Sequence, residues 1–167
     1  MPHLNLRRCE SGVGLIEVII ALFVITIGFF AGAQMQVQSI QYSQESLFRT
    51  QAIRLAQSMA DRMRANPEGV AAGAYSNTST SNQYTTASCL STGCSPAQLA
   101  NEDLVQWKET LSPGDGITPA LPPMIDGSAA KGEISAAVDG VYTIKLSWQA
   151  LIEGETVDSS YSLKVRP

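Results

Sequence analysis

Residues 13–33 read VGLIEVIIALFVITIGFFAGA, an apolar block that contains a single charged residue, Glu17. As a helix, these 21 residues would be about 31 Å long at about 1.5 Å per residue, which matches the roughly 30 Å hydrocarbon core of a bilayer. Arg7 and Arg8 precede the block and supply the positive flank that keeps a segment on the cytoplasmic side. No good signal-peptide cleavage site follows the block, so we predict a membrane-spanning helix rather than an ordinary secretory signal.

Two features inside the block predict contacts with other molecules. A carboxylate such as Glu17 costs about 2.5–3.5 kcal/mol at the centre of a bilayer, so a functional partner is expected for it. The alternative is that Glu17 only reaches the interface and favours the positive end of the helix dipole. Gly28 and Gly32 have G-x-x-x-G spacing, which allows two membrane helices to pack closely, although glycine is also common in membrane helices generally.

The composition argues against catalysis and against nucleic-acid binding. The chain carries a net charge of −4, and the part from Asn66 onward is more acidic still, so sequence-independent binding to phosphates is not expected. The chain has one histidine, His3, outside any expected folded part, and it has no glycine-rich nucleotide motif. We therefore expect no enzyme, no catalytic residue, no cofactor and no metal site.

The helix is predicted to continue beyond Ala33 and to become amphipathic over residues 34–66. Its apolar stripe recurs at helical spacing and consists of Phe48, Ala52, Leu55, Met59 and Met63. Glu45 and Arg49 are placed to form an ion pair on this helix. The helix should end at Asn66, because the residue before Pro67 avoids the α region. The stripe is too short to favour a coiled coil, so the rest of the chain is expected to cover it.

Residues 67–167 are predicted to form that globular part. Residues 67–94 are expected to be a long loop, rich in small and polar residues. Ser95 and Gln98 form a capping-box pattern with Pro96 at the first helical position, which predicts a short helix over 96–111. One face of this helix is apolar, with Trp107 as a core anchor rather than a ligand platform; its residues are Ala100, Leu104, Trp107 and Leu111.

Residues 133–166 alternate as strands do. Ile134, Ala136 and Val138 precede a two-residue hairpin signal, Asp139-Gly140. Two further alternating stretches follow, with a second turn over residues 153–155 between them. Three antiparallel strands with one apolar face would cover the helix stripe. The predicted fold class is therefore α+β, with one long helix packed on a small antiparallel sheet.

The string Gly12-Val13-Gly14-Leu15-Ile16-Glu17, after a short basic leader, resembles the class III signal of type IV prepilins. The segment MADRMRANP, Met59 to Pro67, resembles the end of the long helix in PilV-type minor pilins, the type IV pilus modification proteins. The resemblance implies the pilin architecture, removal of leader residues 1–12 by a cut between Gly12 and Val13, and methylation of the new amino group of Val13. It also implies that Glu17 neutralises the amine of a neighbouring subunit in the filament core.

The cysteines predict a disulfide in the exported part. Cys9 would leave with the leader, so Cys89 and Cys94 remain as an even pair in an oxidising compartment. Metal binding is the alternative, but two cysteines without further cysteine or histidine ligands cannot complete a structural zinc site. We therefore predict a Cys89–Cys94 disulfide that tethers the loop.

The predicted function is that of a minor pilin, a structural subunit that supports pilus assembly, adhesion or twitching motility. Its expected partners are other pilins, prepilin peptidase, the inner-membrane assembly machinery and the membrane, with no nucleic acid. Its expected location is the inner membrane, with the C-terminal part in the periplasm, and then the pilus. The alternatives are a minor pseudopilin of a type II secretion system, an uncleaved membrane-anchored binding domain, and a pilin for DNA uptake, which the acidic exported part disfavours.

Overall fold

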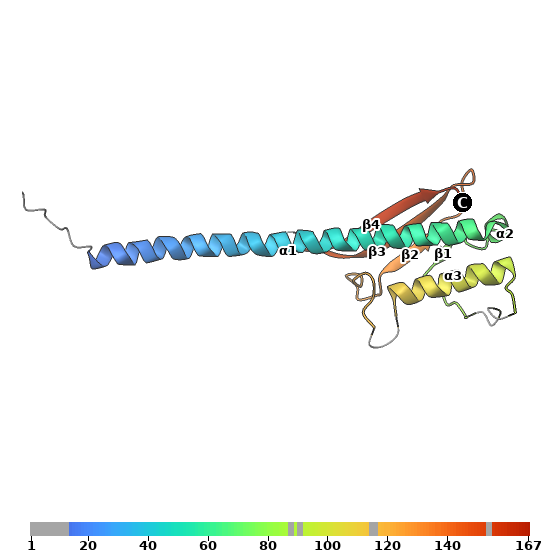
Figure 1. The fold of residues 1–167 in the computed structure, drawn as a ribbon, viewed down its shortest axis with the longest axis horizontal. Helices are drawn as coiled ribbons and strands as arrows, with labels where there is room; N and C mark the ends of the chain where they lie inside the picture. Colours follow the sequence, from blue (N-terminus) through green and yellow to red (C-terminus); the bar gives the residue numbers. More distant parts are fainter. Residues whose placement is uncertain (1–13, 87–88, 90–91, 114–116, 153–154) are drawn as a thin grey trace, which may run out of the picture. The chain divides into compact units, whose positions relative to one another are not determined.

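The computed structural model describes residues 14–86, 89, 92–113, 117–152 and 155–167 (Figure 1). The chain divides into two compact units, Met1–Ile40 and Gln41–Pro167, which we describe separately. A long helix, α1, spans Leu15–Ala65 and contributes to both units. Its start lies two residues after the predicted start at Val13, and its end confirms the helix stop expected before Pro67.

The described part of the first unit consists of Gly14 and the N-terminal part of α1. Every side chain of α1 up to Ile40 is exposed in this unit. Glu17 lies in the first helical turn, where its amide donates to the carbonyl of Gly14 at 2.9 Å. The helix in this unit therefore has no core of its own, and its apolar side chains are free to contact other molecules.

Three helical segments belong to the second unit. The C-terminal part of α1 ends at Ala65, and Asn66 caps the short helix α2, Pro67–Ala71, by accepting a hydrogen bond from the amide of Gly69 at 3.1 Å. The third helix, α3, spans Pro96–Leu111 and has the predicted capping box between Ser95 and Gln98. Proline opens both α2 and α3, where its missing N–H would have no partner in any case.

The second unit also contains a four-stranded antiparallel sheet in the order β1-β2-β3-β4. The strands are β1 Thr78–Ser79, β2 Lys131–Ile134, β3 Tyr142–Ile152 and β4 Glu155–Val165. The predicted hairpin turn between β2 and β3 is present, because Asp139 and Gly140 have φ angles of 51° and 73° and a bridge joins Val138 to Val141. Two consecutive positive φ angles are the signature of a type I′ turn.

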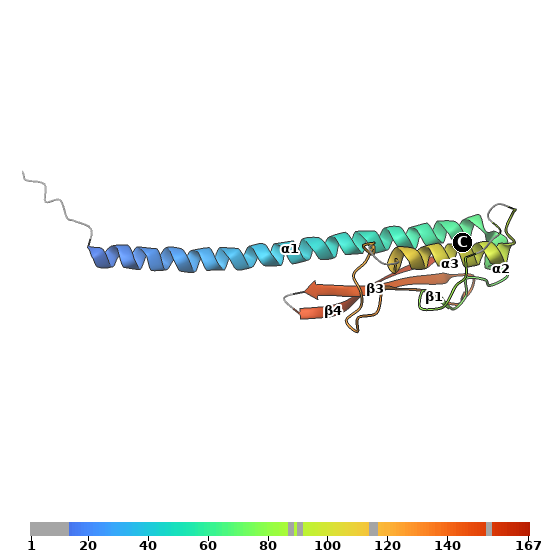
Figure 2. The ribbon, with the colours of Figure 1, turned by 90° about the horizontal axis from the view of Figure 1, so that it is seen from below.

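One face of the sheet carries the core. Figures 1 and 2 show α3 beside the C-terminal part of α1, both over the same face of the sheet. The predicted stripe of α1 is buried here: Ala52, Met59 and Met63 are fully buried, and Phe48 and Leu55 pack against the core. Every residue of the predicted apolar face of α3 is also buried: Ala100, Leu104, Trp107 and Leu111. The predicted α+β fold, a long helix packed on an antiparallel sheet, is confirmed.

After α1, the strands and loops differ from the sequence prediction in two segments. The loop predicted over residues 67–94 contains α2 and the fourth strand, β1. The strand predicted through Ala136 and Val138 ends at Ile134. The amide of Ser135 still donates to the carbonyl of Thr143, and the next pairing is the Val138–Val141 bridge. Between these two pairings, residues 136 and 137 on one side lie opposite the single residue Tyr142 on the other. This extra residue is a bulge, and the amide of Ala136 bonds to the side chain of Asn77 instead of the ladder.

Candidate assembly surface

The candidate functional site is the exposed apolar surface of α1 within the first unit, which we call the assembly surface. Its large apolar residues are 49% to 80% exposed, and they are Leu15, Ile16, Val18, Ile19, Ile20, Leu22, Phe23, Val24, Ile25, Ile27, Phe29, Phe30, Met35, Val37 and Ile40. Within the described residues, α1 is the one helix that is long and apolar enough to cross a membrane by length and composition. A helix that is apolar on all sides requires an apolar environment on all sides.

Glu17 is the single charged residue of this surface. Within the part of the chain that the structure describes, no basic group forms an ion pair with its carboxylate. The predicted cleavage site between Gly12 and Val13 lies outside the described residues. Whether Glu17 has a counter-charge from another molecule is not tested by these contacts, and its pairing stays a prediction.

Gly28 and Gly32 leave open space on the assembly surface. Apart from its chain neighbours and the nearby helix backbone, a Cβ atom built at either residue would have no atom of the described residues within 4 Å. The two positions are four residues apart and so lie on the same side of the helix. This side of the helix therefore carries no side chain at positions 28 and 32, and close packing of another helix there stays a prediction.

In the second unit, a buried polar cluster connects α1 with the segment after α2 and with α3. The carboxylate of Asp103 accepts hydrogen bonds from Arg62 at 3.1 Å and from the Tyr75 hydroxyl at 2.6 Å. Asn66 donates from Nδ2 to the Tyr75 hydroxyl at 3.2 Å and to the carbonyl of Pro96 at 2.8 Å. Burial of Tyr75, and then its hydrogen bond to Asp103, raises the pKa of its hydroxyl well above its usual value.

The polar cluster is absent from the sequence-based predictions. One signal for it exists in the sequence, because Asp103 falls three residues after Ala100 and four before Trp107, on the apolar face of α3. A carboxylate at such a position is buried on folding, so it needs hydrogen-bond donors from elsewhere in the chain. The sequence does not identify those donors, because Arg62 and Tyr75 are far from Asp103 along the chain.

Glu45 connects α1 to the sheet rather than to its own helix. The carboxylate accepts a hydrogen bond from the indole nitrogen of Trp148 on β3 at 3.4 Å. The ion pair predicted between Glu45 and Arg49 is not formed, so that prediction is wrong. The indole N–H lies inside the unit and needs an acceptor, whereas the exposed guanidinium of Arg49 is solvated by water.

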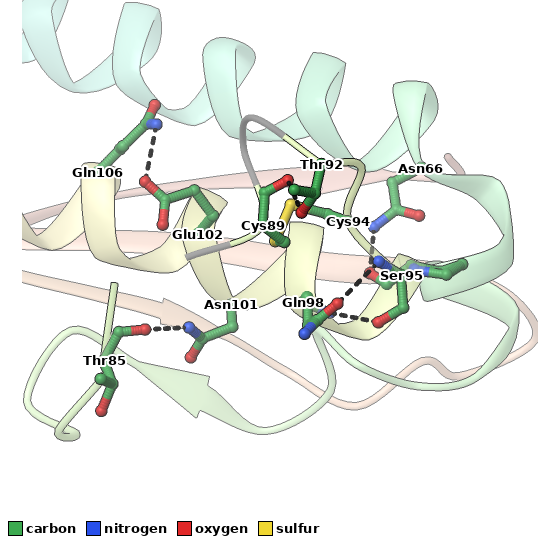
Figure 3. The surroundings of a disulfide bond; sticks show 11 residues. Asn66, Thr85, Cys89, Thr92, Cys94, Ser95, Gln98, Asn101, Glu102 and Gln106 are labelled. Carbon is green, nitrogen blue, oxygen red and sulfur yellow. Dashed lines mark hydrogen bonds between the residues drawn. A yellow bond between two sulfur atoms is a disulfide. The ribbon is translucent and has the colours of Figure 1, made fainter. Parts of the chain in front are cut away.

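The disulfide between Cys89 and Cys94 is present and lies directly before the capping box of α3 (Figure 3). The amides of Thr92 and Gly93 both donate to the carbonyl of Cys89, at 3.0 Å and 2.8 Å, and Gly93 has a φ angle of 96° that favours glycine. The side chain of Asn101 on α3 donates to the carbonyl of Thr85 and holds the preceding part of the loop. The disulfide therefore fixes the entry of the chain into α3.

The comparisons with known proteins give one family match. Residues 34–105 match the model of a family described as Tt1218-like, type IV pilin Tt1218. The match covers less than half of the chain and runs from the amphipathic part of α1 through the disulfide into α3. No curated protein and no solved structure matches the chain significantly. The family match, together with the pilin-like α+β fold, supports a type IV pilin family for this chain.

Proposed function

We propose that this chain is a minor pilin of the PilV type, which is anchored in the inner membrane and then incorporated into a type IV pilus. The proposal is supported by the exposed apolar residues of α1, which include a single carboxylate, Glu17. The segment that follows, residues 34–105, matches a type IV pilin family. The same match favours a pilus over the pseudopilus of a type II secretion system.

A pilin of this type would have four functional segments in this chain. Residues 1–12 are the leader, and prepilin peptidase cuts between Gly12 and Val13 before the amino group of Val13 is methylated. Residues 13–33 span the membrane and later form the filament core. Residues 34–66 form the amphipathic half of the helix, and residues 67–167 form the globular part in the periplasm. The sequence motif at Gly12 to Glu17 supports this division.

Charge pairing gives Glu17 its function in this proposal. Cleavage creates a cationic amine on Val13 at the end of an apolar helix, and a charge buried in a filament core requires a counter-charge. Glu17 lacks an ion-pair partner among the described residues of its own chain, so it is free to pair with the amine of a neighbouring subunit. The pair would set the axial register of adjacent helices in the pilus.

Gly28, Gly32 and the second unit also have functions in the proposed assembly. The open space at Gly28 and Gly32 suits close packing against the helix of a neighbouring pilin. The second unit has its own core and its own disulfide, so it can remain folded while the assembly surface moves from lipid to protein. Contacts with the assembly machinery and a role in adhesion or twitching motility belong to the same proposal.

Substitution of Glu17 tests the proposal. Glu17→Leu should be cut normally and accumulate in the membrane, because leucine suits the bilayer better than a carboxylate does. It should be absent from sheared pili, because an unpaired amine in the core costs several kcal/mol. Glu17→Asp, which keeps the charge, should enter pili in part. Quantitative blotting of membrane and sheared fractions measures both effects, and wild-type levels of the leucine variant in pili would refute charge pairing.

A further inference from the structure

Among the described residues, no strand pairs with the outer edge of β4, the last strand of the sheet. The strand order β1-β2-β3-β4 places β4 at the margin of the sheet, and all 11 of its residues pair with β3 on the other side. A long edge strand presents unpaired N–H and C=O groups that can template another strand. The opposite margin is formed by β1, which has only two residues.

The register identifies which backbone groups of β4 point outward. On β3, the carbonyl of Thr143 accepts from Ser135 and the amide of Gln149 donates to Pro123, so these odd-numbered residues direct their groups away from β4. The even-numbered residues of β3 must therefore bond to β4, and they pair with its odd-numbered residues. The outward N–H and C=O groups accordingly belong to Thr156, Asp158, Ser160, Ser162 and Lys164.

These five residues, which we call the edge residues, are all exposed and polar. Their charges are ordered along the strand, with Asp158 near its beginning and Lys164 near its end. One oxygen of Asp158 accepts from the amide of Ile125 at 3.3 Å, and the other has no hydrogen-bond partner among the described residues. Lys164 forms no ion pair with any described residue.

We propose that β4 pairs antiparallel with β4 of a second copy of this chain. In the register centred on Tyr161, Asp158 of each copy lies opposite Lys164 of the other, and Ser160 lies opposite Ser162. Four of the five edge residues then meet edge residues, and the outward backbone groups of residues 158–164 gain partners. Opposite charges that face each other stabilise such a pair, whereas a parallel arrangement in register would place like charges side by side.

Two separate proline variants test whether the outer edge of β4 forms the dimer. Ser160→Pro removes an outward N–H without affecting the ladder to β3, and proline is tolerated on edge strands in this orientation. Ser159→Pro is the matched control, because it removes an N–H that bonds to β3 and should unfold the sheet. We expect the full chain in detergent micelles to dimerise in sedimentation equilibrium, and Ser160→Pro to weaken the dimer at least tenfold with an unchanged melting temperature. Dimerisation that Ser160→Pro leaves unchanged would overturn the proposal, as would a wild-type chain that stays monomeric.

A charge swap tests the register and does not depend on the proline variants. At low salt, where exposed charges are least screened, Asp158→Lys and Lys164→Asp should each weaken the dimer, and the double variant should restore it. Lys145→Asp is the control, since Lys145 lies on β3 away from the free edge, and it should leave the dimer unchanged. A double variant that is as weak as either single variant would show that Asp158 and Lys164 do not face each other. Glu17 and the apolar part of α1 stay intact in every variant, so the outcome is separate from that of the proposed function.

Discussion

The indole ring of Trp107 on α3 lies directly against the backbone of Gly132 on β2. A Cβ atom at Gly132 would come within 2.5 Å of Cη2 and 2.7 Å of Cζ3 of this ring. Real Cβ atoms essentially never come so close to another atom, so a side chain at Gly132 would force the Trp107 ring or the backbone to shift. The contact of the two layers therefore depends on glycine at this position.

We expect Gly132→Ala to lower the free energy of unfolding by roughly 1–3 kcal/mol, because overpacking forces side chains or backbone to shift. Urea unfolding of the purified chain measures the loss. The double variant Gly132→Ala with Trp107→Leu is the control: removing the ring should make its loss smaller than the sum of the two single losses. A Gly132→Ala variant with wild-type stability would contradict the contact.

The Tyr75 hydroxyl predicts a loss of stability at high pH. Its pKa is raised in the folded chain by burial and by its hydrogen bond to Asp103, whereas tyrosine in the unfolded chain titrates near pH 10. Above about pH 10 the unfolded chain releases this proton and the folded chain retains it, so the free energy of unfolding falls as pH rises. Below about pH 10 the contribution is fully present.

Tyr75→Phe should remove this pH dependence and, at neutral pH, lower the free energy of unfolding by about 1–3 kcal/mol, because Asp103 and Asn66 lose a partner. Urea unfolding at a series of pH values from about 8 to about 11 measures both effects. Tyr84→Phe removes a phenol elsewhere in the second unit and is the control. An identical slope above pH 10 in the wild type and Tyr75→Phe would rule out this assignment.

The disulfide should stabilise the loop before α3 without being necessary for the sheet. Replacement of Cys89 and Cys94 by serine should lower the free energy of unfolding by about 2–3 kcal/mol, as expected for a short closed loop. Circular dichroism should still report the β-structure, since neither cysteine belongs to a strand. Thiol labelling of the wild-type chain from the periplasmic side tests the bond, and quantitative labelling of both cysteines without reductant would argue against it.

The predicted leader cleavage is tested at Gly12. Gly12→Leu should block processing, because a bulky side chain should not fit a peptidase site that accepts glycine, and Gly12→Ala should be cut in most molecules. Migration on a gel, together with intact mass, distinguishes the precursor from the mature chain. Gly14→Ala is a control for a glycine change beside the site, because the nearest atom to a Cβ there among the described residues, outside its chain neighbours, is 3.9 Å away. Mature-sized Gly12→Leu would disprove the cleavage assignment.

Local signals in the sequence determined α1, α3 and one turn, but not the short helix α2. Pro67 ends α1 because its ring restricts the preceding residue, and Ser95 with Gln98 starts α3 because their side chains satisfy free backbone groups at the N-terminus of the helix. The turn at Asp139-Gly140 follows from the ability of these residues to adopt positive φ. The run of apolar residues around Glu17 likewise predicted the assembly surface. Each of these signals acts within a few residues or within one helix, so it can be recognised without knowledge of the tertiary structure.

Only the tertiary structure decided which distant residues meet. No sequence pattern links the segments that meet in the folded chain. Examples are the pairing of β1 with β2, the contact of Trp107 with Gly132 and the hydrogen bond from Trp148 to Glu45. The cluster of Arg62, Tyr75 and Asp103 arises because a carboxylate that is buried against the core takes whichever donors α1 and the segment after α2 bring to it. Burial and sheet order are properties of the folded whole, so the sequence could predict that α1 needs a cover, but not which strand would be left with a free edge.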